Sequence, residues 1–509
     1  MNFAPIDWVI VALYLGLSLV IGISGKRFVG NLTHFLVAGR ELGVYVGIAT
    51  LAATEIGTIT YMYMAELGYK SGFGAFAAAL ISGAAMIFVG QTGFVISRFR
   101  ELNLMTVPEY FEVKYSRGLR ILSGFVVALG GLLNMGVFLK IEGEFLMTVS
   151  GVGSRFLVPA MTAILLLELV YTVLGGMVSV VITDFMQYIL LSIATILISL
   201  YAVHSVGYGA IVAKVERLMG PAGFNPIANP RFGWTFLFWQ ALLWVSLSTC
   251  WQTTAMRMFS TKSAATAKKV MTWTGVIFLG RGMLPMLWGM CALVLFGSGP
   301  LDRMGIPAPI VGGHVVEPIL AMPAMLAQIL GPGVRGLVVA GMLAATMSVN
   351  SSYLLGWSSV ISQDIVVPLR AAMGKSELSS TTQILINRVC NVFVSLFILF
   401  WGLYYVLPDA VYLYLGLTCT IYLSGVFVSV VGGLYWRKAN VAGGYAAMIL
   451  GGVGTIVPFF VLHWSANVTG FAAFGLAAAG LVVGSLLAPG RAARVQAASA
   501  FGPFPRHIR

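Results

Sequence analysis

Charged side chains stand at three isolated positions inside long apolar stretches of the sequence: Glu55, Asp184 and Arg281. Burying a charge in apolar surroundings costs free energy, so such residues are candidates for binding chemistry. A carboxylate can attract a metal cation, hold a proton or bind a cationic group, and the planar guanidinium of Arg281 matches a carboxylate with two parallel N–H donors. Each residue can instead have a structural role. Glu55 and Arg281 can form an ion pair with each other, and Asp184 can be a helix-end charge that its own loop satisfies.

A fourth group of charges, Lys140, Glu142 and Glu144, occupies another apolar stretch. Residues four apart share one face of a helix, so Lys140 and Glu144 can form an ion pair, whereas Glu142 points elsewhere. We interpret the pair as structural, with the lysine stem lying along apolar surface and its charge directed toward the outer end of the helix.

The composition indicates which elements must position these residues. Of the 509 residues, 59% are hydrophobic and only 9% are charged, against roughly 25% charged residues in a soluble domain. So few charges cannot cover a water-soluble surface, which excludes soluble enzymes, nucleic-acid binders and disordered scaffolds. The four cysteines lie in apolar stretches without a CxxC spacing and the five histidines form no cluster, so a metal centre and a membrane-embedded enzyme are not expected.

The chain is therefore predicted to be an all-α polytopic membrane protein, because about 20 apolar residues cross a bilayer as a helix. The sequence contains thirteen such stretches, and the weakest division between two of them is at Gly175 and Gly176. They lie near residues 5–25, 43–67, 73–98, 119–149, 157–175, 177–203, 234–256, 270–297, 333–366, 384–406, 409–436, 441–463 and 467–489.

The basic residues indicate the orientation. With the N-terminus outside, 21 of the 30 Lys and Arg residues, Arg257 among them, fall in cytoplasmic segments and seven in outer segments. Positively charged loops tend to stay in the cytoplasm, so we expect a multi-pass protein of the plasma or inner membrane with its C-terminus inside. Residues 1–489 are expected to form one transmembrane domain, with its core at about 43–436, followed by a basic cytoplasmic tail at 490–509.

Three motifs occur in order along the chain: residues 106–111 read TVPEYF, residues 175–187 read GGMVSVVITDFMQ, and residues 433–440 read GLYWRKAN. Together they resemble the motifs of the sodium:solute symporter family, which includes the sodium/glucose, sodium/proline and sodium/sialic acid carriers. The resemblance is collinear from about residue 5 to about residue 445.

The resemblance implies a LeuT-type fold, in which spans 2–6 and spans 7–11 form two inverted five-helix repeats and spans 1, 12 and 13 are peripheral. Solute and ion then bind near the middle of the membrane, where helices are broken. The second span supports such a break, because Gly57 and several threonines interrupt its apolar residues. The implied function is secondary active transport by alternating access, with Na⁺ as the coupling ion, no organic cofactor, and a small solute and the lipid bilayer as partners.

By this resemblance, Na⁺ is coordinated by the backbone carbonyls of Ala53, Ile56 and Ala345 and by the hydroxyl of Ser348. Na⁺ is a hard cation that prefers such oxygen ligands. The chain departs from the family pattern at Val349, where sodium-coupled members usually have a second hydroxyl. Proton-coupled or uncoupled transport therefore remains the alternative, and so does a Ser348 hydroxyl that bonds only to its own helix. The resemblance also places Asp184 on the inner ion path.

Seven residues are candidates to contact the solute, from the charges, the suspected break and the resemblance: Glu55, Gly57, Thr60, Asn134, Trp251, Gln252 and Arg281. Asn134 can instead join two helices, and Trp251 can be ordinary packing. The acidic sugar contact of the sugar carriers corresponds here to Ala79, so we expect an amino acid or carboxylate rather than a hexose. A solute-sensing receptor is the rival from another class, since some family members carry signalling domains.

Overall fold

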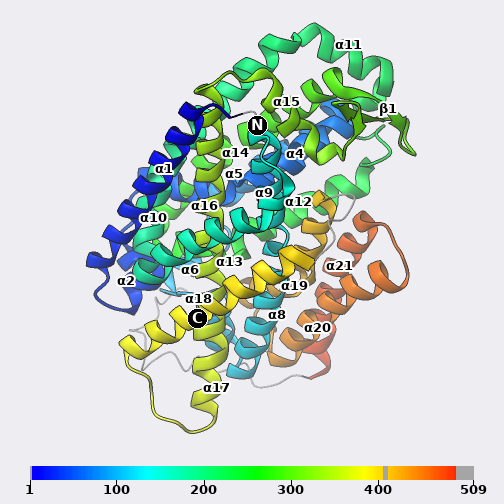
Figure 1. The fold of residues 1–509 in the computed structure, drawn as a ribbon. Helices are drawn as coiled ribbons and strands as arrows, with labels where there is room; N and C mark the ends of the chain where they lie inside the picture. Colours follow the sequence, from blue (N-terminus) through cyan, green and yellow to red (C-terminus); the bar gives the residue numbers. More distant parts are fainter. Residues whose placement is uncertain (1–2, 405–410, 489–509) are drawn as a thin grey trace.

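Apolar helices form nearly the whole chain in the computed structural model, which describes residues 3–404 and 411–488 (Figure 1). The predicted tail at 490–509 lies outside these residues, as do the outermost residues of three predicted spans. The helices of the first half are α1 (Pro5–Ser24), α2 (Leu32–Val37), α3 (Val44–Glu55), α4 (Thr58–Ser71), α5 (Phe76–Thr92), α6 (Ile96–Glu101), α7 (Glu109–Lys114), α8 (Arg117–Met135), α9 (Phe138–Ser150) and α10 (Leu157–Val206).

The second half continues in the same way and adds the only strands of the described chain. Its helices are α11 (Tyr208–Met219), α12 (Gly233–Cys250), α13 (Gln252–Ser260), α14 (Ala264–Phe296), α15 (Ala321–Ile329), α16 (Val334–Val360), α17 (Val367–Ala372), α18 (Ser380–Tyr404), α19 (Val411–Tyr435), α20 (Val441–Ile456) and α21 (Ala466–Leu487). The strands β1 (Gly297–Leu301), β2 (Pro307–Val311) and β3 (His314–Val315) form an antiparallel sheet in the order β1-β2-β3.

Ten helical segments of the described chain are long and apolar enough to cross a membrane. Two of them, Thr58–Thr92 and Ser154–Val206, each cover parts of two predicted spans, and α12 is not among the ten. The predicted count of thirteen therefore stays a prediction, although a helix occupies every predicted position. Along α18, Leu385, Val389, Leu396 and Phe400 are all more than half exposed, and their spacing of four or seven residues forms a continuous apolar face for lipid.

Two breaks lie where the sequence predicted an interruption, and a third, at Trp251 between α12 and α13, was not predicted. Helix α3 ends at Glu55 and α4 begins at Thr58, with Ile56 and Gly57 in non-helical conformations. Helix α10 has 50 residues, about 75 Å at 1.5 Å per residue, which exceeds twice the roughly 30 Å apolar thickness of a bilayer. Its chain turns at Gly176, where φ is +52° and an added Cβ would lie 2.4 Å from the carbonyl oxygen of Phe35.

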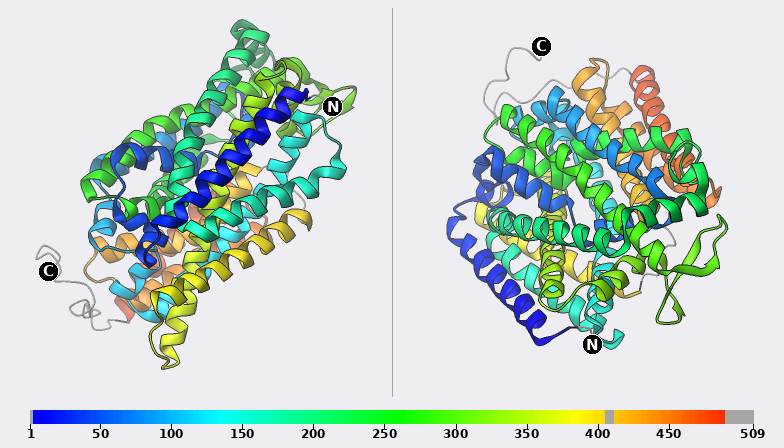
Figure 2. Two further views of the ribbon diagram at one scale, coloured as in Figure 1. Left: turned by 60° about the vertical axis from the view of Figure 1, so that its left-hand side comes forward. Right: turned by 90° about the horizontal axis from the view of Figure 1, so that it is seen from above.

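The predicted peripheral helices lie at the edges of the bundle. Helix α1 runs along one side, against α10 and α16, and α20 and α21 form a pair on the opposite side (Figures 1 and 2). The loops that hold α11, the sheet and α15 gather at the end of the molecule where the N-terminus lies, and α17 extends from the other end (Figure 1). The core between these edges contains both broken helices, α3–α4 and α12–α13.

Candidate solute and ion sites

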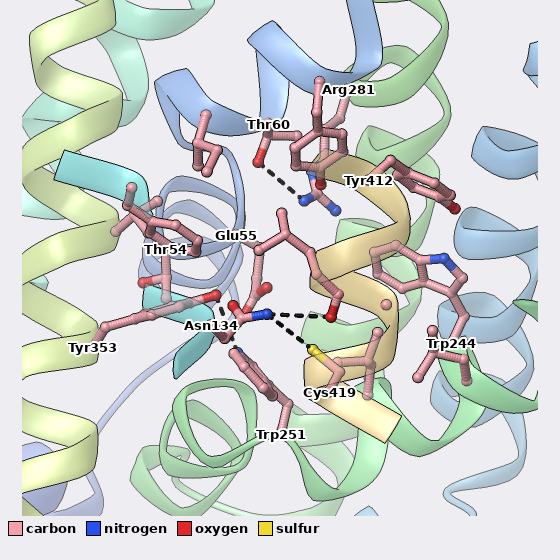
Figure 3. A pocket seen from close by; sticks show the side chains of 18 of the residues that line it. Thr54, Glu55, Thr60, Asn134, Trp244, Trp251, Arg281, Tyr353, Tyr412 and Cys419 are labelled. Atoms are coloured by element: carbon pink, nitrogen blue, oxygen red, sulfur yellow. Dashed lines mark hydrogen bonds between the residues drawn. The ribbon is translucent and has the colours of Figure 1, made fainter. Parts of the chain in front are cut away.

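A cavity of about 80 Å³, measured as the space open to the centres of water molecules, lies beside the break between α3 and α4 (Figure 3). It brings together Glu55, Thr60, Asn134, Trp251 and Arg281, five of the seven predicted solute contacts. Its other lining residues are Thr54, Ile59, Tyr63, Phe138, Gln240, Leu243, Trp244, Leu247, Val349, Tyr353, Tyr412, Leu415, Gly416 and Cys419.

Arg281 is 7% exposed, and its guanidinium has few polar partners. Its Nη2 donates one long hydrogen bond, 3.4 Å, to the hydroxyl of Thr60, and its plane lies over the rings of Phe278 (4.2 Å) and Trp244 (5.5 Å). Nε and Nη1 are buried and have no hydrogen-bond partner among the described residues. Pro285, four residues further along α14, cannot donate the helical hydrogen bond to the Arg281 carbonyl.

Glu55 is held from the other broken helix. Its Oε1 accepts hydrogen bonds from the hydroxyls of Thr254 (2.8 Å) and Thr253 (3.2 Å) in α13. Among the described residues, no ion pair joins Glu55 to Arg281, so the structure does not have the predicted alternative of a closed salt bridge. An acid and a base thus line one cavity without neutralising each other directly (Figure 3).

Trp251 forms an aromatic wall of the cavity. It occupies the non-helical position between α12 and α13, and its Nε1 donates to the hydroxyl of Tyr353 at 3.2 Å. Its ring is stacked on Tyr422 and meets Tyr353 and Trp357 edge-on. Sequence reasoning missed Tyr353, yet its position four residues after Val349 places it on the same face of α16, which is a signal that could have identified it.

Two of the predicted solute contacts do not line the cavity, and a third lines it and also joins two helices. Gly57 packs against Val349, whose Cγ2 would lie 2.9 Å from an added Cβ, and Gln252 accepts a hydrogen bond from the backbone N–H of Val107. Neither residue lines the cavity. Asn134 does, but its Nδ2 also donates to the hydroxyl of Thr418 at 3.0 Å and so joins α8 to α19.

The predicted Na⁺ ligands lie where the α3–α4 break packs against α16. Ala53, Ile56, Ala345 and Ser348 are all buried, and the Thr58 hydroxyl at the break donates to the carbonyl of Met342 at 2.6 Å. Unwound backbone beside a serine hydroxyl offers the neutral oxygens that a hard monovalent cation needs. The methyl groups of Val349 face the break at Gly57, so the site has one hydroxyl fewer than the family pattern implies.

Asp184 is the centre of a fully buried polar network next to this site. It accepts hydrogen bonds of 2.5 Å from Ser348 and from Thr50, and it forms an ion pair with Arg257 at 3.2 Å. Arg257 also donates to Ser352. The expected cytoplasmic position of Arg257 is wrong: it is 0% exposed in α13, because the chain continues as a helix inside the core after the break at Trp251.

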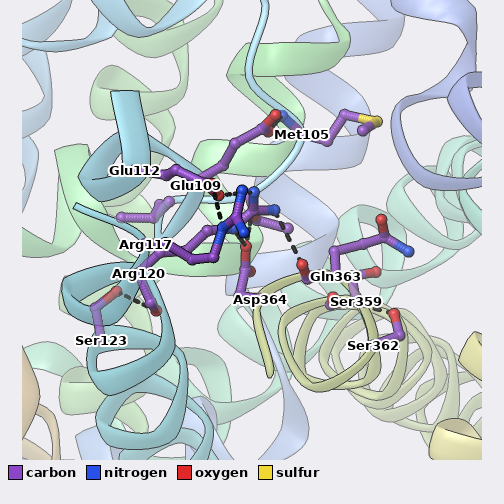
Figure 4. A network of polar contacts seen from close by, with 12 residues as sticks. Met105, Glu109, Glu112, Arg117, Arg120, Ser123, Ser359, Ser362, Gln363 and Asp364 are labelled. Atoms are coloured by element: carbon purple, nitrogen blue, oxygen red, sulfur yellow. Dashed lines mark hydrogen bonds and ion pairs between the residues drawn. The ribbon is translucent and has the colours of Figure 1, made fainter. Parts of the chain in front are cut away.

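A second network connects the TVPEYF segment to the end of α16 (Figure 4). Arg120 donates to Asp364 and Glu112 at 2.8 Å each, and Thr106 donates to the same Asp364 oxygen at 2.9 Å. Asp364 belongs to a π-helical turn, Ile361–Val366, that continues α16. Burial opposes the ionisation of Glu112, but hydrogen bonds from Arg120 and Arg117 outweigh it and lower the pKa of this carboxyl.

Comparisons with known proteins find a family and several relatives that match most of this chain. The model of the sodium:solute symporter family matches residues 35–451. The sodium/pantothenate symporter of Escherichia coli (strain K12) is 27% identical over 473 residues, which are 87% of this chain and 89% of that protein. The sodium/glucose cotransporter of Vibrio parahaemolyticus is 27% identical over 374 residues, 70% of this chain and 67% of that protein.

The chain spans a smaller part of a sodium-dependent multivitamin transporter of Drosophila melanogaster, 63% of its length, with 23% identity over 397 residues. Among solved structures, a Na⁺-coupled sialic acid symporter in a substrate-bound, outward-open state has the same fold, with a TM-score of 0.80. That likeness covers 96% of this chain and 98% of the other at 19% identity. It confirms the LeuT-type fold that the motifs implied.

Proposed function

Because the chain belongs to the sodium:solute symporter family, we propose that it is a secondary active transporter that moves a small carboxylate solute together with Na⁺ by alternating access. The family consists of membrane transporters, so the chain is a transporter and not an enzyme. The proposed solute contacts are the cavity residues Glu55, Thr60, Asn134, Trp251 and Arg281. Gly57 and Gln252 are proposed to act through the break of each helix.

The two unpaired N–H donors of Arg281 are the reason for proposing a carboxylate solute. A buried donor left without a partner costs about 1–3 kcal/mol, and Nε and Nη1 are two such donors on one planar group. A carboxylate in the cavity would accept hydrogen bonds from both nitrogens and would complete a bidentate pair with Arg281. A sugar offers hydroxyls that cannot match this charge. A solute that also carries an ammonium group could reach Glu55, whose hydrogen-bond partners are two neutral threonine hydroxyls.

The size of the cavity limits the solute in the present conformation. A single water needs about 10–15 Å³ by this measure of volume, so about 80 Å³ holds roughly five to eight waters. A solute near the size of proline fits, whereas a larger carboxylate needs the walls to move apart. The relatives named for pantothenate and glucose therefore define a panel of candidate solutes and not an assignment.

The proposed Na⁺ site consists of the carbonyls of Ala53, Ile56 and Ala345 and the hydroxyl of Ser348, with Asp184 on the path to one side of the membrane. Val349 favours one alternative, a carrier of the same fold that is driven by protons or is uncoupled. For the membrane we propose an outside N-terminus and a cytoplasmic C-terminus in the cell membrane, as the distribution of basic residues indicates.

Thermal unfolding of the purified protein tests the proposal. The panel contains proline, pantothenate, sialic acid and glucose, each in Na⁺ and in choline at one pH and ionic strength. A ligand that binds only the folded state stabilises it by about 2.7 kcal/mol at 100 times its Kd. We expect one carboxylate to raise Tm more in Na⁺ than in choline, while its methyl ester has no effect. A Tm rise with glucose alone, or equal rises in both salts, would contradict the proposal.

A further inference from the structure

Two buried glutamates outside the solute and ion sites lie against each other in the membrane-spanning core. Glu142 of α9 is 2% exposed and Glu168 of α10 is 0% exposed. Asn350 of α16, also 2% exposed, donates from its Nδ2 to Glu142 Oε2 at 2.9 Å and to Glu168 Oε1 at 3.4 Å. The sum of these distances, 6.3 Å, is the largest separation that the two carboxylate oxygens can have.

Nothing described in the structure neutralises the pair. Neither carboxylate forms an ion pair with a lysine or arginine among the residues described. Arg388 of α18, a helix that packs against α10, donates instead to the carbonyls of Val173 and Leu174. Lys140 is on the same helix as Glu142, but its positive charge interacts electrostatically with Glu144. Two like charges at this separation in a dry interior disfavour each other, so both cannot be ionised without a cation.

The polar groups at this place also lack at least one hydrogen-bond donor. Glu142 Oε1, Glu168 Oε2 and Asn350 Oδ1 are buried oxygens without a donor among the described groups. The neighbouring hydroxyls do not supply it, because Tyr171 donates to the carbonyl of Met347, Tyr14 donates to the sulfur of the same residue, and Thr346 donates to the hydroxyl of Thr58. Asn350 uses both of its N–H hydrogens, one for each carboxylate. A single proton on one carboxyl provides the missing donor and removes the repulsion.

We propose that Glu142 and Glu168 form a proton-binding site in which the two carboxylates hold one proton between them at neutral pH, with Asn350 as the bridge. The site is distinct from the solute cavity, which none of the three residues lines. The two glutamates titrate as a unit, since the ionisation of one changes the cost of ionising the other.

The position of the bridge connects this proton to the transport cycle. Asn350 follows Ser348 and Val349 on α16, the helix that carries the proposed ion ligand and one wall of the cavity. A displacement of α16 relative to α9 and α10 would withdraw the Asn350 amide from both carboxylates and so change the affinity of the pair for its proton. By reciprocity, pH then biases the same conformational equilibrium. This connection rests on the proposed transport function, whereas the proton site itself does not.

The pH dependence of thermal unfolding tests the proton site without any solute. Glutamates of the unfolded chain lose their protons near a pKa of about 4.3, while the folded pair keeps one, so the folded state binds more protons above that pH. Stability must then fall as pH rises through the neutral range, until the pair itself loses its proton. Glu142→Gln and Glu168→Gln replace a protonated carboxyl by a neutral amide, so each should flatten this slope and raise Tm at alkaline pH relative to wild type.

Glu101→Gln is the control, because Glu101 lies in α6, is 40% exposed and pairs with Arg98, and it should keep the wild-type slope. Infrared spectroscopy gives an independent measurement: a protonated-carboxyl band present in wild type at neutral pH should be lost in both glutamine variants and kept in the control. Wild-type slopes and bands in both variants would overturn the proposal. If a variant does not fold, a wild-type spectrum without such a band at neutral pH would also overturn it.

Discussion

Replacing Arg281 by glutamine distinguishes between two roles of this arginine, solute binding and structural stabilisation. In the structure its guanidinium makes one 3.4 Å hydrogen bond to Thr60 and leaves two buried donors without partners. If those donors bind the solute carboxylate, Arg281→Gln removes charge-assisted hydrogen bonds with a net contribution of about 1.5–3 kcal/mol. This corresponds to a Kd that is about 10- to 150-fold weaker.

The same substitution should destabilise the empty protein less than the breaking of a buried ion pair would. Arg281 loses two ring contacts, each of up to about 2 kcal/mol at a buried site, but no carboxylate loses an ion-pair partner, because Glu55 keeps its bonds to Thr253 and Thr254. The removal of a buried charge offsets part of this loss. Breaking a buried ion pair would instead cost about 3–5 kcal/mol.

The assay is a titration of Tm with the carboxylate identified by the solute panel, in Na⁺, for wild type, Arg281→Gln and Arg281→Lys. The lysine variant keeps the charge but not the planar pair of donors, so its Kd should be intermediate. An unchanged Kd in Arg281→Gln would refute the carboxylate role. A loss of several kcal/mol of stability in the absence of solute would show that the arginine has a structural ion-pair partner.

Three further predictions concern the ion site and the polar networks. Ser348→Ala should weaken the Na⁺ dependence of Tm and Val349→Ser should strengthen it, each by about tenfold in apparent Na⁺ affinity, as one hydroxyl ligand is lost or added; opposite or absent shifts in a Na⁺ titration would place the ion elsewhere. Asp184→Asn should destabilise the protein by about 3–5 kcal/mol, because it leaves Arg257 buried without its counter-charge, and the double variant with Arg257→Met should recover most of that loss in thermal unfolding; equal losses in both variants would argue against a coupled pair. The pKa of Glu112 is lowered in the folded state, so its contribution to the stability of the fold is present above the unfolded pKa of about 4.3 and is lost as pH falls through the folded value. The Tm difference between wild type and Glu112→Gln should therefore be present at neutral pH and vanish in acid. A difference that persists in acid would contradict the prediction.

Much of the candidate site could be predicted because charges are conspicuous in an apolar sequence. Glu55 and Arg281 stood out for that reason, and the cavity contains both. The helix breaks at Gly57 and Gly176 were also predictable, since glycine permits the backbone to leave helical geometry at these positions.

Other features depend on contacts between distant segments and left no local signal. Tyr412 resembles a core aromatic on an apolar helix, and only the packing of α19 brings it to the cavity. Arg257 lies near the expected end of a span, where a basic residue normally faces the cytoplasm. Its burial required the break at Trp251, and the carboxylate of Asp184 is 73 residues away in sequence.

Uptake into proteoliposomes tests the central claim most directly, that Na⁺ drives the movement of a carboxylate solute. The labelled solute from the panel is supplied outside vesicles with an inward Na⁺ gradient, or with an equal K⁺ gradient, at the same pH on both sides. We predict accumulation above the outside concentration only with the Na⁺ gradient. Equilibration without accumulation under both gradients, or accumulation that follows an imposed pH gradient and ignores Na⁺, would contradict it.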